Sequence, residues 1–131
     1  MLVREVMTTP ALTVHPRTPA DEAISLLDQH AITMVPVVSR AGVLVGVLSE
    51  ADVVRDALPP DARTHLIPAG DFQSEGAHDV ADLMNHHPMT VSPDDDLAEA
   101  AVLMTDTAVK SLPVVNHERR VVGVVSRRDI V

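Results

Sequence analysis

The sequence predicts an α/β (α+β) fold built from two copies of one repeat, each with the element order β-α-β-β-α, packed as a pseudo-twofold pair. A shift of 77 positions aligns residues 3–54 with residues 80–131 without a gap. Within each copy, apolar residues at helical spacing precede two short apolar runs that a turn separates. The length of 131 residues suits one compact body, so we expect the two copies to pack face to face.

The repeat also defines the expected organisation of the chain. Identical residues occur at equivalent positions along both copies, such as Met7 and Met84 near the start and Asp52 and Asp129 near the end. We predict a first repeat over residues 1–58, a connecting segment over residues 59–79 and a second repeat over residues 80–131. The connecting segment is rich in Pro, Gly and Asp with little periodicity, which is typical of irregular surface structure.

The first long helix of each copy follows a short extended piece, which in the first copy lies around Val14. Thr18 is the expected N-cap and Pro19 the expected first helical residue. Apolar residues at spacings of three and four then form one helical face as far as about His30.

Two apolar runs follow this helix, over residues 35–38 and 43–48, with a turn between them. They predict an antiparallel hairpin. Ser49 and Asp52 then form a Ser-x-x-acid capping pattern that begins a second helix ending near Leu58. The sequence ends two residues after Asp129, so the equivalent helix of the second copy is expected to be truncated.

Composition argues against several functions. Aromatic residues make up 1% of the chain and the net charge is −9, so neither base stacking nor phosphate-backbone neutralisation supports nucleic-acid binding. The chain has no cysteine, no Walker loop and no Gly-x-Ser-x-Gly element, and we expect it not to be an enzyme. The sequence shows neither a signal peptide nor a run long enough to span a membrane, which favours a cytoplasmic protein.

Two groups of potential metal ligands are expected to have other roles. The acidic run at residues 94–96 suits the N-terminus of the second copy's long helix, where the helix dipole favours carboxylates. His86 and His87 would point to opposite faces of a strand, and His65 and His78 lie in the connecting segment. We therefore predict no metal site.

Four motifs in the same order in both copies resemble the CBS domain. The most specific is Gly-aliphatic-aliphatic-Ser-x-x-Asp, at residues 46–52 and 123–129. Residues 6–7 and 83–84 resemble the "VMT" element that opens the family's domain, and residues 34–38 and 111–115 resemble its "LPVVD" strand. Four motifs at constant spacing, each present twice, make the resemblance specific, and it covers nearly the whole chain outside the connecting segment.

The resemblance implies a Bateman module, a regulatory unit that commonly binds AMP, ADP, ATP or a related adenosine compound in the cleft between repeats. The family's phosphate- and ribose-binding positions fall on Ser49 and Asp52, and on Ser126 and Asp129. Capping of the following helix explains part of the same pattern. The adenine-lining positions, with the strand residue two positions before each serine, fall in the first copy on Ala11, Leu12, Ile32, Thr33, Met34 and Val47, and in the second copy on Pro88, Met89, Val109, Lys110, Ser111 and Val124.

The two copies differ in charge at these positions. Arg127 and Arg128 lie between Ser126 and Asp129, and Lys110 is the only lysine of the chain. The first copy has Glu50, Ala51 and Thr33 at the equivalent positions. Because a guanidinium can bind a phosphate in a bidentate manner, we hypothesise that the site of the second copy binds a phosphorylated ligand more tightly.

Other functions remain open at this point. A pure association module would fill both sites with its own side chains, and a sensor of S-adenosylmethionine or of a metal ion would use them for another ligand. The resemblance also implies a homodimer that passes its ligand occupancy to an unknown regulated protein, with no cofactor apart from the regulatory ligand.

Overall fold

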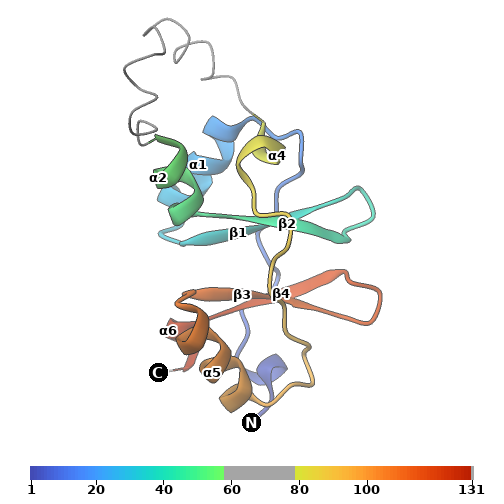
Figure 1. Ribbon diagram of the computed structural model, residues 1–131. Coiled ribbons are helices and arrows are strands. Elements are labelled where there is room, and N and C mark those ends of the chain that lie inside the picture. The colour runs from blue at the N-terminus through green and yellow to red at the C-terminus, as the bar shows by residue number, and fades with distance from the viewer. Residues whose placement is uncertain (58–78, 131) are drawn as a thin grey trace, which may run out of the picture.

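A computed structural model describes residues 1–57 and 79–130, with the side chains of residues 54–57 excepted. Two antiparallel hairpins face each other at the centre, and the helices cover their outer faces (Figure 1). The elements are, in chain order, η1 (Val3–Glu5), α1 (Ala20–Gln29), β1 (Met34–Val38), β2 (Leu44–Ser49), α2 (Glu50–Ala57), α4 (Val80–Leu83), α5 (Leu97–Thr107), β3 (Ser111–Val115), β4 (Val121–Ser126) and α6 (Arg127–Ile130). The mixture of helices and small sheets confirms the predicted fold class.

The two hairpins have the same register at equivalent positions, as the repeat requires. Met34 pairs with Ser49 in the first hairpin, and Ser111 pairs with Ser126 in the second. Each ladder is shifted at the equivalent place, after Val37 and after Val114. The predicted strand–turn–strand unit is therefore confirmed in both copies, and α2 and α6 follow the two hairpins directly.

The expected first strand of each copy is only a single bridge. Val14 donates its N–H to Pro36 O at 3.0 Å and accepts from Val38 N at 2.8 Å, and Val91 bridges Val114 in the same parallel manner. Pro36 has no N–H of its own, so the ladder beside it cannot continue as a regular central strand. The extended piece is thus held on the edge of β1 by two hydrogen bonds.

The start of α1 differs from the prediction by one residue. Pro19 occupies the N-cap position and α1 begins at Ala20, whereas Thr18 was expected as the N-cap. The Thr18 hydroxyl instead accepts a hydrogen bond from His15 N at 3.0 Å and closes the preceding turn. A threonine hydroxyl serves a turn as well as a cap, and the sequence pattern alone does not distinguish the two uses.

The acidic run before α5 has three separate structural roles. Asp96 is the N-cap and its side chain accepts from Ala98 N at 3.0 Å. Asp95 accepts from Ser92 N at 2.8 Å, and Asp94 forms an ion pair with Arg4. The interpretation of this run as helix-starting carboxylates is therefore confirmed for Asp96.

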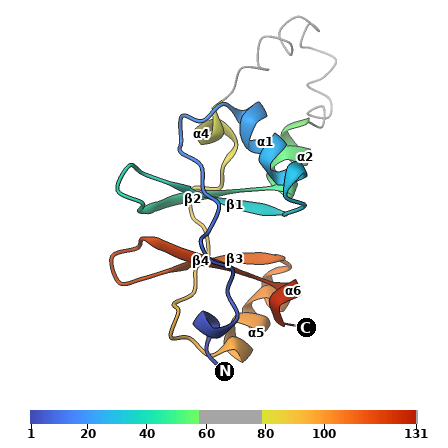
Figure 2. The same ribbon diagram turned by 180° about the vertical axis from the view of Figure 1, so that it is seen from behind.

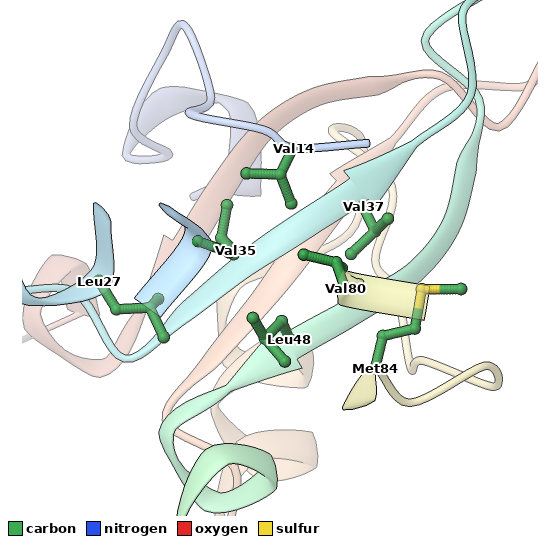
Figure 3. Close-up of a cluster of buried hydrophobic side chains, with 8 residues drawn as sticks. Val14, Leu27, Val35, Val37, Leu48, Val80 and Met84 are labelled. Carbon is green, nitrogen blue, oxygen red and sulfur yellow. The ribbon is translucent and has the colours of Figure 1, made fainter. Parts of the chain in front are cut away.

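The opening segment of each repeat packs in the hydrophobic core of the other repeat. In Figure 3, Val80 of α4 and Met84, which directly follows α4, pack against β1 and β2 of the first repeat, with Val37 and Leu48. Conversely, the buried Val3 of η1 packs in the core of the second repeat. Figure 2 shows η1 beside α5 and α4 beside α1. The two repeats are therefore stacked, and their opening segments are exchanged between them.

Glycines let these exchanged segments cross the strands closely. A Cβ atom on Gly46 would lie 2.8 Å from the backbone oxygen of Asn85 and 2.8 Å from the sulfur of Met84. At the equivalent position, a Cβ on Gly123 would meet Met7 and Thr8 at 2.8 and 3.0 Å. The glycine of the repeated motif is therefore required by packing between the copies.

The two hairpins also bond to each other directly near their turns. Leu44 N donates to Arg119 O at 2.8 Å, and Val121 N donates to Gly42 O at 3.2 Å. Gly42 and Arg119 occupy equivalent positions, and both have a left-handed backbone, with φ values of 83° and 61°. These contacts join the two halves around the pseudo-twofold axis.

No helix of the described ranges is long and apolar enough to cross a membrane.

Candidate functional site

Two clefts lie between the repeats, and both contain predicted site residues. The large cleft has a volume of about 780 Å³ and the small cleft about 220 Å³. The large cleft is lined by Thr8, Pro10, Ala11, Leu12, His30, Ile32, Thr33, Met34, Lys110, Ser111, Val124, Ser126, Arg127, Arg128 and Asp129. The small cleft is lined by Thr33, Met34, Val47, Ser49, Glu50, Ala51, Asp52, Asn85, Pro88, Met89, Ala108, Val109, Lys110, Ser111, Leu112 and Pro113.

The two clefts combine predicted residues differently from the sequence-based grouping. That grouping assigned Ala11 and Leu12 to the same site as Ser49 and Asp52, because all four belong to the first repeat. In the structure, Ala11 and Leu12 line the large cleft with Ser126 of the second repeat. Pro88, Met89 and Val109 conversely line the small cleft with Ser49 and Asp52. Each cleft is composite because the hairpins face each other, so one repeat's apolar wall lies opposite the other repeat's Ser-x-x-Asp element.

The Ser-x-x-Asp elements form the expected helix caps. Asp52 Oδ2 accepts from Ser49 N at 3.0 Å and from Ser49 Oγ at 2.9 Å, while Asp52 N donates to Ser49 Oγ at 3.2 Å. In the second repeat, Asp129 Oδ2 accepts from Ser126 N at 2.9 Å and from Ser126 Oγ at 3.2 Å. The capping interpretation is confirmed in full for Ser49 and Asp52, whereas in the second repeat the bonds run from Ser126 to the Asp129 carboxylate. These bonds hold each serine and aspartate in a defined orientation at the cleft.

The two aspartates differ in their exposure. Asp52 is buried, with 7% of its surface exposed, whereas Asp129 is half-buried at the wall of the large cleft. Within the described part of the chain, Oδ1 of Asp129 has no hydrogen-bond partner. Asp129 can therefore accept hydrogen bonds from a bound molecule while its other oxygen keeps the cap.

The clefts also differ in charge. Lys110, Arg127 and Arg128 line the large cleft together with one carboxylate, that of Asp129, which gives three positive charges and one negative charge. The small cleft has Lys110 with Glu50 and Asp52, which gives one positive charge and two negative charges. Since Coulomb attraction acts strongly over a few ångströms, an anion is favoured in the large cleft.

The cations of the large cleft are available to a bound molecule. Arg127, Arg128 and Lys110 are all exposed, and among the described residues none forms an ion pair. The Arg128 guanidinium donates one long hydrogen bond, of 3.4 Å, to the backbone oxygen of Ala31 in the first repeat. Both arginines are solvent-accessible and at the same time line the cleft.

Sequence reasoning missed several lining residues. Thr8, Pro10 and His30 line the large cleft, and Asn85 lines the small one. Thr8 and Asn85 are equivalent positions in the repeat, and both belong to the exchanged opening segments. The repeat register could have identified this pair, but its place in the clefts depends on the exchange.

The predicted histidine geometry differs from the observed one. His86 and His87 lie in an exposed bend after α4, not in a strand. Residues 1–57 and 79–130 contain no group of three potential ligands close enough to hold a metal ion. His65 and His78 lie outside the described residues.

Curated relatives match along nearly the whole chain. A CBS domain-containing protein from Dictyostelium discoideum is 30% identical over 99% of this chain and 88% of its own length. The CBS domain-containing protein YhcV from Bacillus subtilis is 31% identical over 98% of this chain and 81% of its own length. L-aspartate semialdehyde sulfurtransferase from Methanocaldococcus jannaschii is 28% identical, and the chain spans only 22% of that enzyme's length.

Solved structures of similar fold include ligand complexes. CBSX2, from Arabidopsis thaliana, in complex with AMP has a TM-score of 0.81 at 28% identity, with 98% of this chain and 92% of that chain covered. The CBS domain pair of protein MJ0100 in complex with 5′-methylthioadenosine and S-adenosyl-L-methionine has a TM-score of 0.79 at 25% identity, with 99% and 92% covered. The sequence profile of the CBS domain matches this chain twice, over residues 3–58 and 80–131. The chain therefore belongs to the CBS domain family and contains two copies of that domain.

Proposed function

We propose that the chain is a regulatory module that binds an adenine nucleotide, such as AMP, ADP or ATP, between its two repeats. The observation that carries the proposal is the large cleft, where Lys110, Arg127 and Arg128 surround the Ser126–Asp129 pair. Guanidinium and ammonium groups bind phosphate through charge-assisted hydrogen bonds. Relatives with the same architecture support this ligand class, because CBSX2 was solved with AMP.

Each part of a nucleotide has a matching surface in the large cleft. Ala11, Leu12 and Ile32 supply an apolar wall for the base, since the described part of the chain has no Phe, Tyr or Trp side chain for stacking. The Oδ1 atom of Asp129 can accept hydrogen bonds from the two ribose hydroxyls. We propose that the phosphate points towards Arg127 and Arg128, which follow Ser126 and line the same cleft.

The small cleft favours a different ligand of the same class. Glu50 and Asp52 give it a negative charge, which would repel a phosphate. An adenosine compound without phosphate, such as the 5′-methylthioadenosine bound to the MJ0100 pair, suits this cleft better. We therefore propose that the two clefts are unequal and that the large cleft is the preferred phosphate site.

Calorimetric titration of AMP into Asp129→Ala and Asp52→Ala variants tests this assignment. We expect Asp129→Ala to weaken AMP binding at least about tenfold, in line with the loss of charge-assisted hydrogen bonds, and Asp52→Ala to change it less. Asp106→Ala removes an exposed carboxylate of α5 outside both clefts and serves as the matched control. Equal loss in both variants, or a greater loss in Asp52→Ala, would contradict the preference for the large cleft.

A melting screen separates nucleotide sensing from the rival function of a pure association module. A ligand that binds only the folded chain raises its melting temperature by mass action. We expect a rise with AMP, ADP or ATP, which is smaller in Asp129→Ala. If adenosine compounds at millimolar concentration leave the melting temperature unchanged, the sensing proposal fails and the association module is favoured.

We further propose that the module acts as a homodimer and passes ligand occupancy to a partner protein. On α5, the aliphatic side chain of Val102 is 58% exposed, so this helix offers an apolar contact point that such an assembly would cover. Sedimentation of the wild type and of Val102→Glu tests the assembly. We expect a dimer for the wild type and a shift towards monomer for the variant. A wild type that stays monomeric over a roughly 100-fold increase in concentration would contradict it.

A further inference from the structure

Four residues line both clefts and form the partition between them: Thr33, Met34, Lys110 and Ser111. The hydroxyl groups of Thr33 and Ser111 lie 3.4 Å apart and join the two repeats at this partition. Thr33 and Lys110 are equivalent in the repeat, as are Met34 and Ser111. The partition is therefore symmetric in its backbone but carries one lysine, on one side only.

The backbone of Lys110 is fixed while its side chain is exposed. Lys110 O accepts a hydrogen bond from Arg127 N at 3.0 Å, just as Thr33 O accepts from Glu50 N at 2.9 Å. The lysine side chain is a flexible four-carbon stem that ends in a single ammonium group. From an anchored position in the partition, that ammonium can serve either cleft, and it can serve only one of them at a time.

We propose that Lys110 couples the two clefts, so that a phosphate bound in one withdraws the ammonium from the other. This rests on the proposed function, because it requires AMP to bind the large cleft first, as the preferred phosphate site, and the small cleft more weakly. With the ammonium directed to the large cleft, the small cleft retains only the carboxylates of Glu50 and Asp52. A second phosphate would then enter a site with two negative charges and no cation. Two AMP molecules therefore bind with negative cooperativity, whereas two adenosine molecules do not.

Direct repulsion between two bound phosphates also predicts negative cooperativity. The two mechanisms differ in the effect that removal of the lysine has on this cooperativity. Lys110→Thr gives position 110 the same residue type as the equivalent position 33 of the first repeat. If repulsion between phosphates causes the cooperativity, the coupling would persist or increase in this variant. If the shared ammonium causes it, the coupling would disappear. The double variant Thr33→Lys/Lys110→Thr moves the lysine to the equivalent place in the other repeat, where we expect coupling to return.

Methyl NMR resolves the two occupancies separately. The methyl signal of Ala11 reports the large cleft, and that of Met89 reports the small one. Titration of the wild type with AMP should show that filling one cleft weakens the other at least about fivefold. Titration with adenosine should show no such effect. In Lys110→Thr the AMP coupling should fall to within about twofold of none, and in the double variant it should reappear.

The outcomes separate this inference from the function on which it rests. If AMP fills both clefts of the wild type without coupling, or if Lys110→Thr keeps or increases the coupling, the proposed coupling by Lys110 is wrong, whereas the proposed nucleotide binding is unaffected. If AMP shifts neither methyl signal, the proposed function itself is wrong. Far-UV circular dichroism of both variants checks that each is folded, and the return of coupling in the double variant excludes a purely structural effect of the Lys110 substitution.

Discussion

Replacement of Gly46 by alanine tests whether the exchange of opening segments holds the two repeats together. The added Cβ would lie 2.8 Å from Asn85 O, which is backbone and cannot rotate away, and 2.8 Å from the Met84 sulfur. Asn85 is bonded at this point to β2, through Val47 N to Asn85 O at 3.1 Å and Asn85 N to Val47 O at 2.8 Å. Relief of the clash therefore requires the exchanged segment to move away from the strand.

The expected cost follows from these contacts. Two backbone hydrogen bonds contribute about 1 kcal/mol each, and overpacking of a well-packed site costs about 1–3 kcal/mol. The two costs are not fully additive, because movement of the segment away from the strand relieves the clash but breaks the hydrogen bonds. We therefore expect a total loss of about 2–4 kcal/mol in the free energy of unfolding. For a chain of this length that lowers the melting temperature by roughly 10 °C.

Thermal unfolding followed by circular dichroism measures this change. Gly42→Asn is the matched control, because Gly42 has a φ of 83° but a Cβ added to it would meet no atom within 4 Å, and Asn tolerates left-handed backbone. Because a left-handed backbone strains any L side chain to some degree, we expect Gly42→Asn to lower the melting temperature by no more than about 4 °C. The packing argument is refuted if Gly46→Ala melts within about 2 °C of the wild type, or if the two variants are equally destabilised.

Three further substitutions test the packing and the caps. Val80→Ala should destabilise the fold by about 1–3 kcal/mol in urea unfolding, because it shortens a fully buried side chain that the second repeat contributes to the core of the first repeat. Thr105→Ala, at an exposed position of α5 with a side chain of nearly the same shape as valine, should cost less than about 0.5 kcal/mol. Equal costs would contradict the exchanged core. Asp96→Ala removes the N-cap of α5 and should cost about 0.5–2 kcal/mol, whereas Asp96→Asn should retain most of the stability, so an equal loss in both would show that the cap bond is not the cause. Arg4→Ala should cost less than about 1 kcal/mol and less still at high salt, because both partners of the Arg4–Asp94 ion pair are more than half exposed; a larger, salt-independent loss would indicate packing by the arginine stem instead.

Much of the fold could be predicted because its determinants are local. The apolar periodicity of α1, the two apolar runs of each hairpin and the Ser-x-x-Asp caps each depend on residues within a few positions of one another. The first strand and the N-cap of α1 were less predictable. The Thr18 hydroxyl could act either as a helix cap or in a turn, and Val14 could lie either in a regular strand or in a single bridge. The contacts with neighbouring elements decided which structure each residue adopts.

The candidate site could be predicted residue by residue, but its assembly could not. Every position predicted from the repeated motifs, from Ala11 to Asp129, lines one of the two clefts. Ala11, Leu12 and Ile32 were grouped with the Ser-x-x-Asp element of their own repeat but lie with that of the other, because motif spacing describes neighbours along the chain. Opposition of two hairpins brings together residues that are far apart in sequence, such as Leu12 and Ser126.

The sequence by itself determined the duplication, the elements of each copy and the unequal distribution of charge, since the first copy has no cation at the positions equivalent to Arg127, Arg128 and Lys110. Only the tertiary structure decided that the opening segments are exchanged, that each cleft is shared between repeats and that Lys110 stands in the partition of both. The physical reason is that identical apolar faces in two copies can be buried either within a copy or across copies. Local propensity is the same in both arrangements, and the choice depends on which one packs the strands, the glycines and the crossing segments without a clash.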